Sequence, residues 1–289
     1  MSSVLMFRHK DCPDTKTVIE FIKSQVNWTD AVNSVNHLDF NPKDLFIKTI
    51  SNHSDILTEV NFLYNKVGKV FWRSQDSREL FGLSLSYNPD TDPQEWKFGS
   101  FGHPRYRRYS KYDYFDKPQI DQPQSLKHDY LDSYGFRKFL PELEQCPALL
   151  TLLNSFSLPV VRVTARTIDG GCCYPTNTPN GGMHKDDPVF EMIRINVCLS
   201  NNGNFGLQYE GSEPIFTNPG DIYAINSDVN HRVYVNKLSY FKRTHLVIGL
   251  CPWVNYNSDE DVWYLNKYFG KIHPLDLVKN NLIFKKEAI

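Results

Sequence analysis

The spacing of apolar residues along the chain changes near residue 159. Before that point several segments repeat apolar residues every three to four positions, as the buried face of a helix does. The helices expected on this basis are Thr15–Val26, a segment beginning at Asn41-Pro42, Ser54–Lys66 and a leucine-rich stretch over 140–153. Strand-like runs lie at Val70–Trp72 and Leu80–Tyr87, and the polar residues 88–127 are expected to form long loops. Residues 1–158 are therefore expected to mix helices and strands.

From residue 159 onward apolar and polar residues alternate, which is the period of a strand. The expected strands are Val160–Arg166, Met192–Leu199, Phe205–Tyr209, Asp221–Asn226, Val229–Val235 and Arg243–Cys251. Many short strands joined by turns rich in Gly, Pro and Asn are typical of a sandwich or jelly roll, here over 159–253. The last part, 254–289, returns to a helical pattern, with Ser258 as a cap. We expect the three parts to form one compact domain.

Two of these strands separate an apolar face from a polar one. In the run Ile193–Leu199, Arg194, Asn196 and Cys198 share one face and the aliphatic residues share the other. In the run after Arg243, that arginine and His245 share a face. A jelly roll has a packed outer face and an interior lumen, so these polar faces predict a lumen that binds a charged small molecule.

Composition narrows the class of protein. The chain has 289 residues, of which 40% are hydrophobic and 14% aromatic, as in a packed globular protein with a sizeable core. The net charge of -1 provides no basic field for nucleic acid. Six cysteines without a CxxC motif, including the adjacent pair Cys172-Cys173, favour reduced thiols. With neither a signal peptide nor a long apolar run, we expect a cytoplasmic protein that does not span a membrane.

The chemistry of this sequence is concentrated in His184, Asp186 and His231. Two imidazoles and one carboxylate can hold Fe(II) on one face and leave the opposite face open, as in non-haem iron oxygenases. On an extended segment, residues two apart point the same way, so His184 and Asp186 can share an ion. The gap to His231 holds about three short strands, which is enough to return the chain beside the first pair.

Arg243, twelve residues after His231, completes the set. Fe(II) with two neutral imidazoles and one carboxylate carries one positive charge, and a bound 2-oxoglutarate dianion makes the sum negative. An arginine restores neutrality, and a neutral assembly is far cheaper to bury than a charged one. Its planar fork also matches a carboxylate.

A second HxD motif, His53-Ser54-Asp55, is followed at a similar distance by His103. It lies at an expected helix start, where Asp is an ordinary first-turn residue, and His103 lies in an expected loop. The set built on His184 lies among the strands, with an arginine on the strand after its last histidine. We therefore prefer the set built on His184 as the metal site.

The segment from about 160 to 253 resembles the aspartyl/asparaginyl β-hydroxylase family of Fe(II)/2-oxoglutarate oxygenases, particularly the cis-4-proline-hydroxylase-like members. The pieces that carry the resemblance are VVRVTAR, MHKDD, MIRINVCL, NPGDIYAINSDVNH and RTHLVIGLCPW. They cover about a third of the chain. The resemblance implies an α+β chain with a mainly β core, a double-stranded β-helix of the jelly-roll or cupin-like kind with flanking helices.

The resemblance also implies roles for individual residues. His184, Asp186 and His231 would bind Fe(II), and Arg243 would bind the co-substrate 2-oxoglutarate. Asn196 stands where relatives place a histidine near the co-substrate, so a neutral amide replaces an imidazole. Arg194 matches an arginine that contacts the substrate carboxylate in relatives. The co-reactant would be O2, with ascorbate as a reductant.

Other residues invite more than one interpretation. Arg162 and Arg166 share a strand face and are candidates for binding an anionic substrate, or else they face outward toward acidic neighbours. His245 is either part of the site or a satisfied lumen histidine. The run from Arg105 to Tyr112 interleaves bases with aromatics, but Asp113 and Asp116 follow it. A solvated loop or substrate lid is therefore preferred over a nucleic-acid surface.

The sequence thus predicts an Fe(II)/2-oxoglutarate-dependent dioxygenase. The expected reaction is hydroxylation of an unactivated C–H bond of a carboxylate-bearing amino acid, or of a residue in a peptide or protein. No catalytic residue is expected beyond the metal ligands. The alternative from another class is a non-catalytic cupin-like module that binds a metal or ligand, which the complete metal set and Arg243 disfavour.

Overall fold

The computed structural model describes residues 4–7, 12–25, 70–73, 79–89, 125–126, 132–169, 183–186, 188–236 and 242–285. These residues form mainly antiparallel β-sheets with few helices. Among them, no helix is long and apolar enough to cross a membrane. Several sequence features lie outside the described residues: the expected helices at 41–66, the second HxD motif with His103, the basic run 105–112, and Cys172-Cys173.

The larger sheet has seven antiparallel strands in the order β1-β11-β8-β13-β7-β3-β2. Their bounds are β1 Val4–Phe7, β2 Val70–Arg73, β3 Glu79–Ser84, β7 Val160–Asp169, β8 Ile193–Ser200, β11 Ile222–Ile225 and β13 Lys242–Leu250. The strands expected from 159 onward are confirmed, with shifts of a few residues at their ends. The first and last thirds of the chain thus meet in one sheet.

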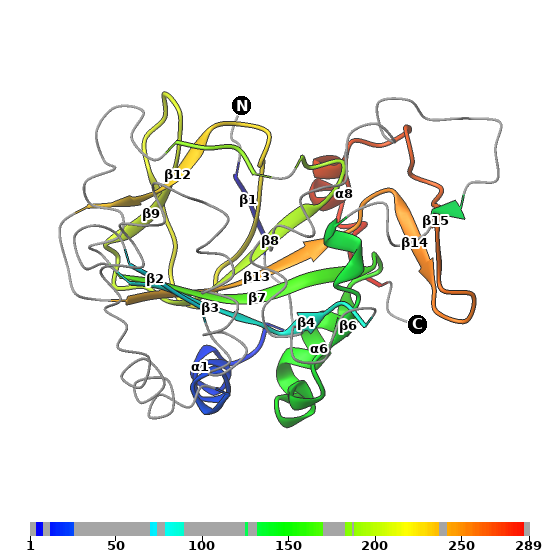
Figure 1. Cartoon of the computed structure of the whole chain (residues 1–289). Helices are drawn as coiled ribbons and strands as arrows, with labels where there is room; N and C mark the ends of the chain where they lie inside the picture. The colour runs from blue at the N-terminus through cyan, green and yellow to red at the C-terminus, as the bar shows by residue number, and fades with distance from the viewer. Residues whose placement is uncertain are drawn as a thin grey trace, which may run out of the picture.

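A smaller antiparallel sheet has the order β10-β9-β12. Its strands are β9 Phe205–Tyr209, β10 Ile215–Phe216 and β12 His231–Val235. Along the sequence the chain alternates between the sheets: β8 is in the large sheet, β9 and β10 in the small one, β11 in the large, β12 in the small and β13 in the large. Figure 1 shows β9 and β12 above the large sheet, with helices α1 (Thr15–Ser24) and α6 (Pro147–Ser155) below it.

One apolar core joins the large sheet to three helices. It includes Val18 from α1, Leu152 from α6 and Leu277 from the short helix α8 (Pro274–Lys279), all fully buried with Ile195 and Leu246 of the sheet. Asp14 caps α1, because its side chain accepts a hydrogen bond of 2.9 Å from the Thr17 amide. The helices therefore cover one face of the sheet and leave its other face to the small sheet.

The alternation expected along β8 and β13 is confirmed. The aliphatic residues of both strands, Ile193, Ile195, Val197, Leu199, Leu246, Ile248 and Leu250, belong to the core under the sheet. Five of the residues that alternate with them, Arg194, Asn196, Arg243, His245 and Val247, line a cavity between the two sheets. Because side chains on a strand alternate between faces, one strand both closes the core and builds the cavity.

The expected helical pattern after residue 253 is partly wrong. Strands β14 (Val254–Asn257) and β15 (Val262–Leu265) form a hairpin, and β15 also pairs with β5 (Ser125–Leu126). Ser258 lies in the hairpin turn, where the Asn257 side chain accepts from the amides of Asp259 and Glu260. The aromatic and β-branched residues of β15 favour a strand, and Trp263 is fully buried. A helix begins only at Pro274.

The remaining short elements connect these parts. They are the paired strands β4 (Ser86–Tyr87) and β6 (Lys138–Phe139), and the 3-10 helices η5 (Asp132–Gly135) and η6 (Pro141–Gln145). The leucine-rich stretch expected to be helical is divided at Cys146 into η6 and α6, where Pro147 opens the second helix.

Candidate metal centre and its pocket

His184 and His231 are held side by side by their backbones. The His184 amide donates to the His231 carbonyl at 3.0 Å, and the His231 amide donates back at 2.9 Å. This bridge adds His184 to the free edge of β12, and residues directly opposite in such a pair place their side chains on the same face. The two imidazole ring centres are 4.9 Å apart.

Asp186 joins the two histidines from the same extended segment. Its amide donates to the Ser227 carbonyl at 3.2 Å, which keeps the chain running beside the approach to β12. One potential ligand atom from each of His184, Asp186 and His231 lies within 4.8 Å of the others. His231 is buried, Asp186 is half-buried and His184 is exposed, so the cluster lies at the mouth of the cavity.

The His231 ring has a defined role for each nitrogen. Its Nδ1 lies 2.8 Å from the Val229 carbonyl, which can only accept, so Nδ1 carries the proton. The Nε2 atom then keeps its lone pair, and it lies 3.3 Å from Oδ2 of Asp186. Two atoms bound at right angles to one divalent transition metal at about 2.1 Å would lie about 3 Å apart. The donor set and its spacing therefore fit such an ion.

Asp186 is held in its ionised form. Burial alone would raise its pKa, but the groups around the carboxyl, among them the positively charged Arg194, outweigh burial and place the pKa well below its ordinary value. Arg194 Nη1 donates to Asp186 Oδ2 at 2.5 Å. An ionised carboxylate is the form that binds a metal ion.

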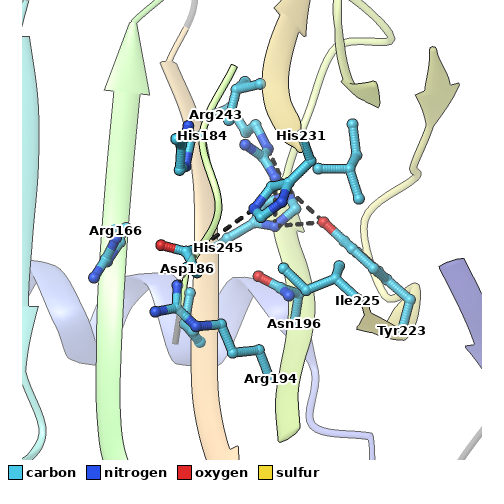
Figure 2. A pocket seen from close by; sticks show the side chains of 13 residues that line it. Arg166, His184, Asp186, Arg194, Asn196, Tyr223, Ile225, His231, Arg243 and His245 are labelled. Atoms are coloured by element: carbon cyan, nitrogen blue, oxygen red, sulfur yellow. Dashed lines mark hydrogen bonds and ion pairs between the residues drawn. The ribbon is translucent and has the colours of Figure 1, made fainter. Parts of the chain in front are cut away.

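A second cluster lies deeper in the cavity. Arg243 and His245 from β13 meet Tyr223 from β11, and all three side chains are buried. Arg243 Nε donates to His245 Nε2 at 2.8 Å, and Arg243 Nη2 donates to the Tyr223 hydroxyl at 3.2 Å. Figure 2 shows these contacts. Sequence reasoning did not single out Tyr223, although the alternation of Ile222 and Ala224 with Tyr223 places it on the polar face.

The cavity contains most of the residues predicted from the sequence. Its lining includes the three candidate metal ligands and, beyond them, Arg166, Arg194, Asn196, Tyr223, Arg243 and His245. Apolar side chains complete the wall: Leu207, Ile225, Val233 and Val247. The described lining of the cavity therefore includes three arginines and one carboxylate.

Arg162 does not line this cavity. It lies four residues before Arg166 on β7, where the pairing with β13 shifts register between Val247 and Gly249. Arg162 has a positive φ of 49°, so the regular alternation of the strand is broken at this residue. The shared face expected for Arg162 and Arg166 is consequently interrupted between them.

Neither a protein-family model nor a curated protein matches this sequence. Solved structures of 2-oxoglutarate oxygenases are similar to it. One is an oxidoreductase of the 2OG-Fe(II) oxygenase family from Burkholderia pseudomallei, with 17% identity over 38% of this chain and 56% of that chain, at a TM-score of 0.26. This chain thus spans little more than half the length of that protein.

Two further similar structures contain 2-oxoglutarate. HygX from Streptomyces hygroscopicus, with nickel, 2-oxoglutarate and hygromycin B bound, is 12% identical over 41% of this chain and 69% of its own, at a TM-score of 0.25. A full-length protein from Neurospora crassa, in complex with alpha-KG, is 11% identical over 83% of this chain and 79% of its own, at a TM-score of 0.30. Scores this low carry no argument, so the function is argued from the chain's own residues.

Proposed function

We propose that this protein is an Fe(II)/2-oxoglutarate-dependent dioxygenase that hydroxylates an unactivated C–H bond. One observation carries the proposal: His184, Asp186 and His231 converge within 4.8 Å at the mouth of a cavity whose interior presents a buried arginine. Two imidazoles and one carboxylate leave several positions of an iron ion open, which suits a metal that must also bind a co-substrate and dioxygen.

We further propose that the fold is a double-stranded β-helix. The order β11-β8-β13-β7 in one sheet faces the order β10-β9-β12 in the other, with His184 paired beyond β12. From β8 to β13 the chain alternates between the two sheets, with β9 and β10 together in the small one, as the chain of a jelly roll does. This winding explains why the metal cluster comes from the edge of the small sheet and the arginines from the large one.

The side chains present fit the iron ion that the proposal requires. His184, Asp186 and His231 would hold it, with Nε2 as the donor of His231. When bound, iron together with 2-oxoglutarate and O2 supplies the oxidation that converts C–H to C–OH, while 2-oxoglutarate becomes succinate and CO2. Ascorbate is the proposed reductant. The chain's own part is to bind the two organic reactants, orient the C–H bond and keep water away.

Arg243 is the proposed partner of the distal carboxylate of 2-oxoglutarate. It is 8% exposed, lines the cavity and has its Nη1 nitrogen without a hydrogen-bond partner among the described residues. Asn196 also lines the cavity and is proposed to donate a hydrogen bond from its amide. Iron, Asp186, Arg243 and the 2-oxoglutarate dianion sum to zero charge, which lowers the cost of burying them together.

The substrate is proposed to carry a carboxylate. Besides Arg243, the cavity is lined by Arg166 and Arg194. A guanidinium can bind a carboxylate through two hydrogen bonds, so arginines that line a cleft can orient an anion. The substrate is therefore a carboxylate-bearing amino acid, or such a residue in a peptide or protein. Arg162 is not part of this proposal, because it does not line the cavity.

The test is release of succinate from 2-oxoglutarate by purified protein with Fe(II), ascorbate and O2. We expect slow release even without the organic substrate, and faster release when the correct amino acid or peptide is supplied. Asp186→Ala is the matched negative control, since it keeps the fold's β-core and removes one donor. Equal release by the wild type and this variant would refute the proposal.

The alternative is a cupin-like module that binds a metal or ligand without turnover. It shares the cluster of His184, Asp186 and His231, and it predicts a tightly held zinc ion and no succinate. Metal analysis of the purified protein alongside the succinate assay separates the two functions. The buried arginine next to the cluster favours the enzyme, because a structural metal site does not need it.

A further inference from the structure

Arg243, His245 and Tyr223 form a closed network at the back of the cavity. Their exposed fractions are 8%, 3% and 1%. Besides the two bonds donated by Arg243, the Tyr223 hydroxyl lies 3.1 Å from His245 Nδ1. Arg243 Nη2 also lies 2.8 Å from that nitrogen. Three side chains from two strands thus share four polar contacts.

The contacts identify the acceptors in this network. Arg243 Nε carries a single hydrogen, which points at His245 Nε2, so the imidazole accepts from the guanidinium there. The Tyr223 hydroxyl oxygen accepts from Arg243 Nη2. His245 Nδ1 lies 3.1 Å from that hydroxyl and 2.8 Å from Arg243 Nη2.

His245 must also stay neutral in this arrangement. A proton on Nε2 would face the guanidinium of Arg243 and add a second buried cation beside it. Burial, and then the charge of Arg243, lower the pKa of His245 well below its ordinary value. The imidazole is therefore built to accept a hydrogen bond from the arginine.

The network uses one edge of the guanidinium. All bonds of Arg243 within it involve Nε and Nη2, which lie on the same side of the planar group. The N–H groups of Nη1 remain for a ligand. An arginine side chain has many rotamers, and fixing it beforehand removes an entropic cost from binding. What fixes Arg243 therefore affects how tightly it binds a carboxylate.

We propose that His245 is a positioning residue for the co-substrate: as a neutral imidazole that accepts from Arg243 it holds the Nε–Nη2 edge of the guanidinium and commits Nη1 to the distal carboxylate of 2-oxoglutarate. This inference rests on the proposed function of Arg243. It assigns His245 a role that acts through the arginine, without contact between the imidazole and the co-substrate. Tyr223 completes the same clamp by accepting from Arg243 Nη2.

The test compares two substitutions of His245 in Co(II)-loaded protein, in which binding of 2-oxoglutarate can be measured without turnover. His245→Gln can accept from Arg243 Nε at the position of Nε2, whereas His245→Leu cannot. Binding of 2-oxoglutarate is measured by calorimetry, Co(II) affinity by a separate titration, and folding by thermal unfolding. We expect the leucine variant to bind 2-oxoglutarate about tenfold or more weakly, the scale of one lost charge-assisted hydrogen bond.

The glutamine variant should bind 2-oxoglutarate within about threefold of the wild type, because the acceptor is restored. Both variants should keep the wild-type affinity for Co(II). Tyr223→Phe removes the other acceptor of the clamp and should also weaken 2-oxoglutarate binding. A merely structural role of His245 would instead lower the unfolding temperature of both variants alike and produce no difference between Gln and Leu in affinity.

The outcomes distinguish a failure of this inference from a failure of the proposed function on which it rests. If Co(II)-loaded wild type binds no 2-oxoglutarate, the proposed function itself fails. If the wild type binds it and His245→Leu, folded at the assay temperature, binds it equally well, only the positioning role is wrong. If His245→Leu does not fold, the pair of His245→Gln and Tyr223→Phe decides: equal wild-type affinity in Tyr223→Phe, or a tenfold loss in His245→Gln, overturns the inference.

Discussion

Arg194 and Asp186 form an ion pair in which Nη1 lies 2.5 Å from Oδ2, the same oxygen that lies 3.3 Å from His231 Nε2. The arginine that the family resemblance assigns to the substrate thus contacts a candidate metal ligand. A carboxylate oxygen has lone pairs for both an arginine and a metal ion, so the contact is compatible with metal binding. It places a cation next to the metal position, and this has a measurable consequence.

Removing the charge of Arg194 should tighten metal binding. The guanidinium and a divalent ion would share one carboxylate oxygen, and their repulsion at such short range weakens binding. We expect Arg194→Gln to bind Co(II) about tenfold more tightly than the wild type. Arg194→Lys keeps the charge and should stay near the wild-type affinity. A titration in which the glutamine variant binds Co(II) no better than the lysine variant would contradict this prediction.

Loss of either His184 or Asp186 should abolish metal binding. His184→Ala and Asp186→Ala each remove one of three donors, and we expect the affinity for Co(II) to fall by more than about 100-fold, since the two remaining ligands cannot hold an exchangeable ion firmly. His53→Ala, in the second HxD motif, is the matched control and should bind Co(II) as the wild type does. If His53→Ala lost Co(II) binding while His184→Ala and Asp186→Ala kept it, the metal site would instead involve His53 and Asp55.

Arg243→Ala should separate co-substrate binding from metal binding. The variant loses the charge proposed to bind 2-oxoglutarate, so the concentration needed for half-maximal succinate release should rise by about 10- to 100-fold. Co(II) affinity should not fall, because Arg243 contacts none of the three candidate ligands in the described structure. An unchanged 2-oxoglutarate requirement would point to Arg166 or Arg194 as the anion's partner.

Stability should fall in mild acid because His245 is buried in its neutral form. The groups that face it are Arg243 on its own strand, Tyr223 on β11, and Cys198 and Arg166 on the paired strands β8 and β7. Burial and Arg243 lower the pKa of His245 in the folded state. Below its ordinary value of 6.5 the unfolded chain therefore binds more protons than the folded one.

The sign follows from linkage: the free energy of unfolding falls as the pH drops below about 6.5, by at most about 1.4 kcal/mol per pH unit from this one residue. Asp186 acts in a lower window, because its depressed pKa adds stability that is lost only as the pH falls below about 4. Urea unfolding at about pH 6.5 and about pH 5.5 measures the effect. His245→Gln should show the smaller change between these values, and identical changes in both proteins would disprove the prediction.

The strands and their faces were predictable because they depend on local alternation. The run Ile193–Leu199 has the pattern of a strand with Arg194 and Asn196 on the polar face, and both residues line the cavity. The structure of the segment after residue 253 was harder to predict from its sequence. Its aromatic residues pair in a hairpin whose stability comes from the burial of Trp263, and that burial depends on residues far away in sequence. Ser258, a plausible helix cap by type, therefore lies in a turn.

The sequence by itself determined which side chains are able to bind a metal and an anion, because the chemistry of His, Asp and Arg and the two-residue period of a strand are local properties. Only the tertiary structure decided which of these side chains meet. The backbone bridge between His184 and His231 joins segments far apart in the chain, Tyr223 reaches Arg243 and His245 from another strand, and a register shift interrupts the face that Arg162 would share with Arg166. Each of these depends on strand pairing between distant segments, whose register is set by the packing of the whole sheet rather than by any one segment.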